Sequence, residues 1–306
     1  MESVREKVVV VTGATSGIGR AVSLNLARSG VRLVLLGRNR ERGQRLAERI
    51  GGCQRTQAEF YQADLSSLSE VRKVAAQIKE RFPVVDVLIN NAGLRLDTFH
   101  KTSEGIERTF ATNHLGHFLL TALILEQLLR APSARVITVG SGAHSGIHQA
   151  PVWVLTESTY DRRLAYGTSK LANIIFAYEL GRRLSGTKVT SNAVDPGSVV
   201  TNFSRNNGIV PWLRHLIHCI LKGRLAPGNA AQSIAYVALS DELRHVSGLY
   251  FSECKPVSSS KLSRDLLVAR QLWSLSVRLT KLDIGLGDAW EFIKPLDGMA
   301  VGCRLQ

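Results

Sequence analysis

The sequence predicts an α/β fold with one doubly wound domain, in which helices cover both faces of a seven-stranded parallel sheet. Short β-branched apolar runs alternate with amphipathic helical stretches along most of the chain, as is typical of a parallel sheet with crossover helices. No linker rich in Pro, Gly or Ser divides this region, and 44% hydrophobic residues suffice for a sizeable core. We therefore expect one domain over residues 1–255, followed by a C-terminal helix and tail over 256–306.

Seven apolar runs are the predicted strands, and each of the first six ends in a turn of unusual composition. The runs are residues 8–11, 31–36, 58–63, 86–90, 135–140, 188–194 and 247–251. In an open α/β sheet, the ligand crevice lies outside the carboxyl ends of the strands. We therefore look for functional residues in the turns that begin at Thr12, Gly37, Asp64, Asn90, Ser141 and Asp195.

The net charge of +14 raises the question of an anionic partner. The densest basic group, from Arg28 to Arg55, contains no nucleic-acid-binding motif and no interleaving of aromatic with basic residues. We expect a solvated surface there and no nucleic-acid partner. The 4 cysteines are too scattered for a metal site and too few for a disulfide framework, which favours a reducing, cytoplasmic setting. We expect no signal peptide and no transmembrane segment, because residues 1–7 hold no apolar core and the longest apolar segments are charged or too short to span a bilayer.

The stretch TGATSGIGR, Thr12 to Arg20, is the first predicted ligand site. Its three glycines lie between a strand and a helical stretch, so bare backbone N–H groups gather at a positive helix end. Such a turn binds the diphosphate of a dinucleotide in a Rossmann-type fold. Its glycines are spaced Gly-x-x-x-Gly-x-Gly, whereas the usual dinucleotide-binding fingerprint is Gly-x-Gly-x-x-Gly. The candidate cofactor ligands here are Gly13, Thr15, Ser16, Gly17, Ile18 and Gly19.

The end of the second strand distinguishes the two nicotinamide dinucleotides. An acidic residue there holds the 2′-hydroxyl of the adenosine ribose, whereas an arginine accommodates a 2′-phosphate. Arg38 and Asn39 follow this strand, and no acid stands nearer than Glu41. The sequence therefore favours NADP(H) over NAD(H).

Tyr166 and Lys170 are the strongest catalytic candidates. They are four residues apart in a helical stretch and so project from one face. A phenol with a pKa near ~10 is a poor acid–base catalyst at neutral pH, but a nearby ammonium stabilises the phenolate and lowers that pKa. Tyr160 and Tyr178 have no lysine four residues further on.

Together these motifs resemble the short-chain dehydrogenase/reductase family, and more narrowly its retinol-dehydrogenase-like branch. The resemblance runs from about residue 6 to about 280 and is carried by TGATSGIG (12–19), NNAG (90–93), TNHLGHF (112–118), SGAH (141–144), YGTSKLAN (166–173) and DPGSVVT (195–201). The branch is indicated by SKLANIIFAYELGRRL, GLYFSEC and LLVARQLWSLS.

The resemblance implies a catalytic tetrad of Asn113, Ser141, Tyr166 and Lys170. Tyr166 would exchange the proton with the substrate oxygen, and Ser141 would hydrogen-bond that oxygen. Lys170 would bind the nicotinamide ribose and lower the pKa of Tyr166, while Asn113 would hold a water that links Lys170 to solvent. The further cofactor contacts are Asp64 at the adenine, Asn90 and Gly93 along the adenosine, and Pro196, Gly197 and Thr201 at the nicotinamide, with the neighbouring Leu65, Ala92 and Val199.

The expected substrate is a small molecule, namely a bulky hydrophobic compound that carries a carbonyl or alcohol group. The stretch at about 198–228 corresponds to the family's mobile lid, and its apolar residues stand at helical spacing beside arginines and lysines. It fits either a simple lid or a basic amphipathic helix that rests on a membrane surface. In the long segment 142–165, Trp153 is a candidate for the substrate wall. His144 and His148 stand at metal-pair spacing without a third ligand, so we expect no metal.

The favoured hypothesis is an NADP(H)-dependent carbonyl reductase or alcohol dehydrogenase for a retinoid, steroid, terpenoid, polyketide or lipid aldehyde, working in the reductive direction. A non-catalytic NADP(H)-binding regulator or scaffold and a carbon–carbon double-bond reductase are the alternatives. The apolar helix at 114–130 and the Tyr166 helix form either a homodimer interface or a face buried within the monomer. Residues 258–279 predict a serine-capped amphipathic helix, with a loosely specified tail beyond it.

Overall fold

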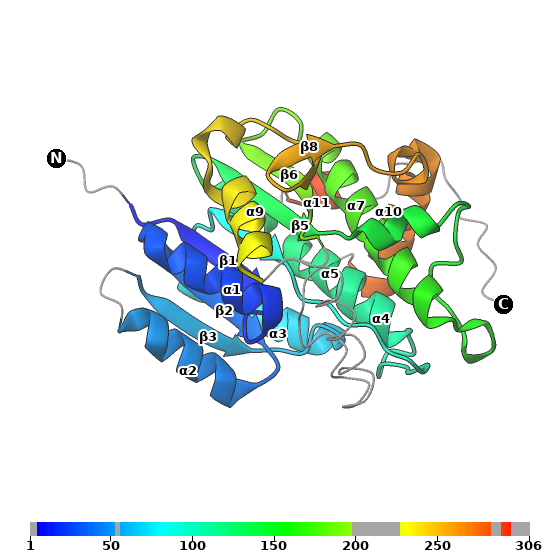
Figure 1. Cartoon of the computed structure of the whole chain (residues 1–306), viewed down its shortest axis with the longest axis horizontal. Coiled ribbons are helices and arrows are strands. Elements are labelled where there is room, and N and C mark those ends of the chain that lie inside the picture. Colours follow the sequence, from blue (N-terminus) through cyan, green and yellow to red (C-terminus); the bar gives the residue numbers. More distant parts are fainter. Residues whose placement is uncertain (1–4, 53–55, 198–226, 283–288, 295–306) are drawn as a thin grey trace.

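A computed structural model of the chain describes residues 5–52, 56–197, 227–282 and 289–294 (Figure 1). Its centre is an 8-stranded sheet with the order β3-β2-β1-β4-β5-β6-β7-β8. Neighbouring strands from β3 to β7 pair in parallel, and β8 is antiparallel to β7. The strands are β1 (Val8–Thr12), β2 (Arg32–Gly37), β3 (Ala58–Gln62), β4 (Val87–Asn90), β5 (Ala134–Val139), β6 (Val189–Asp195), β7 (Tyr250–Ser252) and β8 (Lys255–Val257).

The predicted α/β fold and its seven parallel strands are confirmed, and β8 is an addition that the prediction missed. Ser252 pairs with Lys255, so only Glu253 and Cys254 form the connecting turn. Both have positive φ angles, 49° and 63°, as a tight two-residue hairpin requires. Neither residue is a usual choice for that conformation, and β8 contains a proline, so the sequence carries no ordinary hairpin signal here. The predicted division at residue 255 stays a prediction, and β8 spans it.

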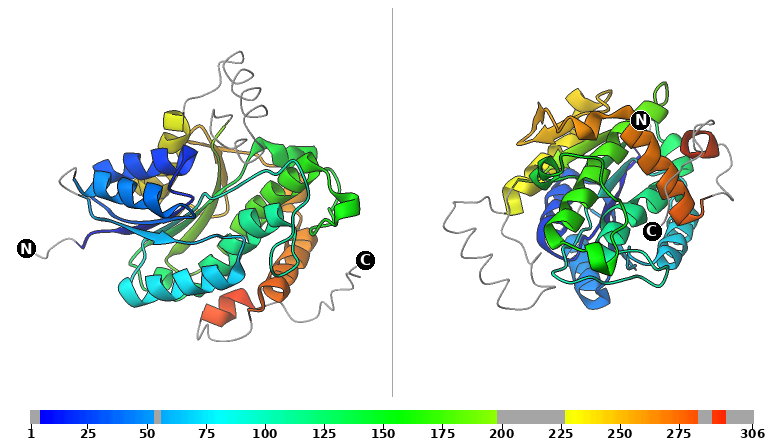
Figure 2. Two further views of the ribbon diagram at one scale, coloured as in Figure 1. Left: turned by 90° about the horizontal axis from the view of Figure 1, so that it is seen from below. Right: turned by 90° about the vertical axis from the view of Figure 1, so that its right-hand side faces the viewer.

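Helices cover both faces of the sheet (Figure 2). One face carries α1 (Gly17–Leu26), α2 (Arg40–Gly51) and α9 (Pro227–Leu239). The other carries α3 (Leu68–Arg81), α4 (Arg108–Phe110), α5 (Gly116–Leu123), α6 (Leu125–Leu129) and α7 (Arg162–Arg183). Because successive strand side chains point to opposite faces, Val9 and Val11 join the first core, whereas Val8 and Val10 join the second.

A further helix, α10 (Leu266–Thr280), packs on α7 and is followed by the short α11 (Trp290–Ile293). The predicted helix is therefore present, but the predicted serine cap is wrong. A 3₁₀ turn at Leu262–Arg264 intervenes, and the Asp265 side chain accepts hydrogen bonds from the N–H groups of Leu267 and Val268.

The indole of Trp273 anchors α10 to the helices beneath it. Its ring stacks on Phe176 at 5.9 Å and meets Phe118 edge-on at 5.0 Å, while the Arg183 guanidinium lies 4.2 Å from the ring centroid. Within the described residues, this helix of the same chain thus buries apolar side chains of both α5 and α7. The homodimer through these helices stays a prediction.

The order of the strands places a crevice between β1 and β4. From β1 the chain runs outward to β2 and β3, then restarts at β4 on the other side of β1. The chain therefore leaves β1 for α1 on one face of the sheet and leaves β4 for α4 and α5 on the other face. Such a switch point at the carboxyl edge is the ligand position in these sheets. Within the described residues, none of the helices combines the length and the apolar character that crossing a membrane requires.

Candidate active site

The glycine-rich turn after β1 packs directly against the turn after β4. Gly13 has a φ of 65°, and a Cβ on it would lie 2.8 Å from the Cα of Ala92. A Cβ on Gly19 would lie 2.3 Å from the carbonyl oxygen of Gly13 and 2.5 Å from Nδ2 of Asn91. Both glycines are therefore required for the approach of the two turns, independently of any ligand.

A buried hydrogen-bond network fixes the same two turns. The Thr12 hydroxyl oxygen accepts from the N–H groups of Asn91 at 2.8 Å and Ala92 at 2.9 Å. His117 donates from Nδ1 to the carbonyl oxygen of Asn113 at 2.8 Å, which leaves Nε2 to pair with the Thr12 hydroxyl at 2.9 Å. Burial lowers the pKa of His117 to about 4, so the ring is neutral. His117 thus connects the predicted diphosphate turn with the predicted catalytic Asn113.

The N-terminus of α1 is open to an anion. Ser16 precedes this helix, and its side chain makes no capping hydrogen bond. By contrast, α2, α3, α7 and α10 are capped by side chains, namely those of Asn39, Ser67, Asp161 and Asp265. Uncapped N–H groups at a helix start favour a negative charge, so the turn fits the diphosphate of a dinucleotide. Thr15 borders this turn against Gly37, and Ile18 is half-buried in the first turn of α1.

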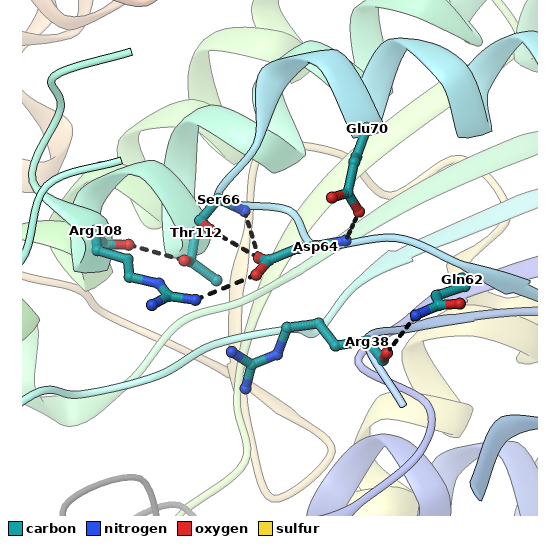
Figure 3. Close-up of polar contacts among 7 residues, drawn as sticks. All are labelled: Arg38, Gln62, Asp64, Ser66, Glu70, Arg108 and Thr112. Carbon is teal, nitrogen blue, oxygen red and sulfur yellow. Dashed lines mark hydrogen bonds and ion pairs between the residues drawn. The ribbon is translucent and has the colours of Figure 1, made fainter. Parts of the chain in front are cut away.

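The predicted adenosine residues lie at the ends of β2 and β3 (Figure 3). Arg38 is exposed, and its carbonyl oxygen accepts a hydrogen bond from the Gln62 side chain at 3.0 Å. Asp64 is half-buried after β3, on the same edge. Asn39 uses its side chain to cap α2, and the side chain of Leu65 is buried in the core. Arg38 and Asp64 are therefore the side chains of this set that neither cap a helix nor lie buried in the core.

The NNAG turn presents its glycine to the crevice and not its first asparagine. Asn90 is fully buried, and its Nδ2 donates to the Thr121 hydroxyl at 3.0 Å. Gly93 is exposed, and a Cβ on it would lie 3.5 Å from Oδ1 of Asn113 and 3.6 Å from Nζ of Lys170. Any contact of Asn90 with a cofactor therefore belongs to its backbone.

Asn113 lies in a π-helical turn, residues 111–115, between α4 and α5. Its Oδ1 accepts from the Leu94 N–H at 2.8 Å, and its Nδ2 donates to the Leu94 carbonyl at 2.9 Å and to the Ser169 hydroxyl at 2.9 Å. The side chain thus ties the segment after β4 to α7, one residue before Lys170. Its predicted role in holding a water stays a prediction.

Ser141, Tyr166 and Lys170 come together where β5 ends and α7 begins. Ser141 follows β5, and its hydroxyl hydrogen-bonds the Tyr166 side chain. Lys170 lies one helical turn beyond Tyr166, with Nζ 5.8 Å from the centroid of the phenol ring. That Nζ donates to the Val139 carbonyl at 2.9 Å. The structure therefore brings these three predicted residues to one point, with Asn113 next to Lys170 across Gly93.

The electrostatics of this cluster differ from the expectation. Burial raises the pKa of Tyr166 to about 12, opposed by the Ser141 hydrogen bond and the charge of Arg95. Burial also lowers the pKa of Lys170 to about 8, opposed by the carboxylate of Asp195. The predicted lowering of the Tyr166 pKa by Lys170 is not seen, because burial dominates and Lys170 directs its ammonium to the Val139 carbonyl. Tyr166 is consequently protonated at neutral pH.

The buried Lys170 predicts a pH dependence of stability. Because its pKa is about 8 in the folded protein and 10.5 ordinarily, the unfolded chain binds more protons between these values. The contribution of Lys170 to the free energy of unfolding therefore rises with pH in that window, by at most about 1.4 kcal/mol per pH unit. Urea unfolding of wild type and Lys170→Met at several pH values should show this rise in the difference between them. Parallel stability curves would contradict it.

Two residues near the cluster were not among the residues predicted to bind the cofactor or to take part in catalysis. The Tyr250 hydroxyl donates to Oδ2 of Asp195 at 3.0 Å, and Oδ1 of Asp195 accepts from the Gly197 N–H at 2.9 Å. Asp195 was named as the start of the turn after the sixth strand and as part of the DPGSVVT motif, but without a role, and Tyr250 lies in the last parallel strand. Pro196 is buried, and Gly197 has a φ of 73°. The other predicted nicotinamide contacts, Val199 and Thr201, and most of the predicted lid lie outside the described residues.

The long segment after Ser141 has structural contacts. Trp153 is 7% exposed and packs near Phe110 in the core, so it is not the substrate-wall contact considered for it. His144 donates from Nδ1 to the Ser141 carbonyl at 2.7 Å, and its Nε2 accepts from the Ser260 N–H at 3.1 Å. Both ring nitrogens are thereby used to tie the β5 turn to the segment before α10.

Comparison with known proteins agrees with this geometry. The short chain dehydrogenase family model matches residues 7–209. Retinol dehydrogenase 12 of Mus musculus is 38% identical over 287 residues, which cover 93% of this chain and 88% of that protein. Retinol dehydrogenase 11 of Homo sapiens is 38% identical over 281 residues, covering 91% and 87%.

Solved structures show the same fold. The crystal structure of an uncharacterised protein from Mycobacterium paratuberculosis superposes with a TM-score of 0.71 at 32% identity, over 91% of this chain and 95% of that one. A short chain dehydrogenase/reductase family protein gives a TM-score of 0.62 at 27% identity, over 81% and 96%. The chain therefore belongs to the short chain dehydrogenase family of nicotinamide-dependent oxidoreductases, with retinol dehydrogenases among its relatives.

Proposed function

We propose that the protein is an NADP(H)-dependent reductase, which transfers hydride to the carbonyl group of a bulky hydrophobic substrate. The observation that carries the proposal is the protonated, buried Tyr166 hydrogen-bonded to Ser141 beside Lys170. The relatives named retinol dehydrogenases support an apolar substrate such as a retinoid, steroid, terpenoid, polyketide or lipid aldehyde.

The chemistry follows from which of these groups carries a proton at neutral pH. Bound NADPH supplies the hydride. A carbonyl oxygen that approaches Ser141 and Tyr166 accepts hydrogen bonds from both, and Tyr166 gives up its proton as negative charge develops on that oxygen. Tyr166 is protonated at neutral pH, so it holds the proton that reduction of a carbonyl group consumes. The Ser141 hydrogen bond and the charge of Arg95, which both act to lower the pKa of Tyr166, stabilise the phenolate left behind.

The assay that tests the proposal has two stages. Fluorescence titration with NADPH and NADH establishes cofactor binding, and a screen of hydrophobic ketones and aldehydes for NADPH oxidation establishes turnover. Binding with turnover of saturated carbonyl compounds supports the proposal. Binding without turnover of any compound favours the non-catalytic regulator, and turnover of enones alone favours the double-bond reductase.

The exposed Arg38 predicts the choice between NADPH and NADH. Arg38→Ala should weaken NADPH binding about ten- to a hundredfold, because a charge-assisted contact with the 2′-phosphate is lost, and should leave NADH binding nearly unchanged. Parallel titrations measure both affinities. Arg49→Ala, exposed near the far end of α2, is the matched control for the loss of one charge. An equal loss for both cofactors would show that Arg38 does not bind the phosphate.

A further inference from the structure

Arg108, the first residue of α4, reaches across to the adenosine end of the crevice. Its Nη2 lies 3.2 Å from Oδ2 of Asp64, forming an ion pair between side chains that are 36% and 24% exposed. Figure 3 shows the guanidinium groups of Arg108 and Arg38 on the same side of Asp64, with Arg108 alone of the two bonded to it. The carboxylate therefore has one arginine as a partner and a second nearby.

The backbone of Arg108 is held at both of its polar groups. Its N–H donates to the His100 carbonyl at 2.9 Å, and its carbonyl oxygen accepts from the Thr112 hydroxyl at 2.8 Å. Glu107, which is almost fully buried, caps the turn by accepting from the N–H groups of Thr109 and Phe110. The backbone that carries the guanidinium is thus held in place.

Most of the hydrogen-bond acceptor positions of the Asp64 carboxylate are already occupied. Oδ1 accepts from the Ser66 N–H at 2.9 Å and from the Ser66 hydroxyl at 2.8 Å. An ionised carboxylate has about four acceptor positions, two on each oxygen. Ser66 fills those of Oδ1, and Arg108 takes one of Oδ2. Among the described residues nothing else bonds the carboxylate, so its remaining position lies on the oxygen that Arg108 holds.

We infer that Arg108 is a positioning residue for the adenine end of the cofactor, holding Oδ2 of Asp64 as the acceptor for the 6-amino group of adenine. The inference rests on the proposed function and adds a residue to it. An amino group donates and a carboxylate only accepts, so the pairing requires Asp64 to be ionised and correctly turned. Arg108 acts through Asp64 on the base, whereas Arg38 is assigned to the 2′-phosphate.

The charge state of Asp64 agrees with this role. Burial alone would raise the pKa of its carboxyl, but the Ser66 hydrogen bonds and the charges of Arg38 and Arg108 hold that pKa below its usual value. Removal of Arg108 should therefore raise the pKa of Asp64, so that protonation of the carboxyl weakens binding at a higher pH.

The experiment uses three dinucleotides: NADPH, NADH and the analogue of NADPH in which hypoxanthine replaces adenine. Hypoxanthine presents a carbonyl oxygen where adenine has its amino group, so it repels the carboxylate. We expect Arg108→Ala to weaken NADPH and NADH about tenfold each, the loss typical of a charge-assisted contact. In this variant, the ratio of the affinity for NADPH to the affinity for its hypoxanthine analogue should fall. The loss of NADPH affinity on acidification should also begin at a higher pH than in wild type.

Control variants separate this role from others. Arg108→Lys keeps the charge and should restore part of the affinity, and Arg49→Ala should change none of the three affinities. Thermal unfolding establishes that each variant is folded. If Arg108→Ala is not folded, the smaller loss of affinity expected for Arg108→Lys is measured in its place.

Three results would overturn the inference while the proposed function stands. A loss for NADPH alone would make Arg108 a phosphate ligand, an unchanged adenine preference would show that it does not act through Asp64, and unchanged affinities would remove any role. If wild type binds none of the dinucleotides, the proposed function fails and the inference fails with it.

Discussion

Tyr166→Phe is expected to abolish carbonyl reduction while leaving NADPH binding intact. The substitution removes the hydroxyl that hydrogen-bonds Ser141 and keeps the ring that lies 5.8 Å from Nζ of Lys170. Loss of a positioned proton donor lowers the rate about 10²- to 10⁴-fold. Steady-state assays with the best substrate of the screen measure kcat, and fluorescence titration measures the affinity for NADPH.

The control for this variant is another phenol outside the cluster. Tyr236 lies on α9 and donates its hydroxyl proton to Glu242 at 3.2 Å, so Tyr236→Phe should keep full turnover. A Tyr166→Phe protein that binds NADPH and still reduces the substrate at the wild-type rate would remove Tyr166 as the proton donor, and the mechanism with it.

Trp273→Ala is expected to lower the free energy of unfolding by about 3–5 kcal/mol, the range for truncating a large buried aromatic residue. The side chain is 2% exposed. It contacts Phe118 and Phe176, carries the Arg183 guanidinium over its ring, and donates from Nε1 to the Ile293 carbonyl at 2.7 Å. Urea unfolding of the two proteins, followed by circular dichroism, measures the difference.

An exposed position on the same helix provides the comparison. Leu267 is 59% exposed, so Leu267→Ala should change the stability by no more than about 0.5 kcal/mol. If Trp273→Ala were equally mild, α10 would not be held to α7 by this contact. Size-exclusion chromatography of the Trp273 variant also reports on the predicted homodimer, because loosening α10 would expose the faces of α5 and α7.

The parts of the fold and site that could be predicted are those encoded in short stretches. Strand β1 is a run of valines followed by the glycine turn, and Tyr166 and Lys170 are separated by one helical turn. In each case the residues that specify the feature are neighbours in the chain. The same holds for Arg38, whose place at the end of β2 follows from the strand itself.

The parts that could not be predicted depend on contacts between distant segments. The pKa of Tyr166 depends on how completely the folded chain buries the phenol, which the Tyr-x-x-x-Lys spacing does not report. The bond between Arg108 and Asp64 joins residues 44 apart, and the bond between Tyr250 and Asp195 joins residues 55 apart. Likewise, β8 depends on the positive φ angles of Glu253 and Cys254, and these residue types do not predict that conformation.

The close packing of Gly13 and Gly19 against Asn91 and Ala92 has a consequence for altering this enzyme by mutagenesis. A library that diversifies the first of these loops alone would lose most of its members to steric collision with the second, whatever cofactor is selected for. Changes in the second loop would not make room, because the nearest atoms are backbone atoms, the Cα of Ala92 and the carbonyl oxygen of Gly13. Directed evolution of cofactor use would therefore proceed further from Arg38 and Arg108, whose side chains are partly in solvent, than from the glycines.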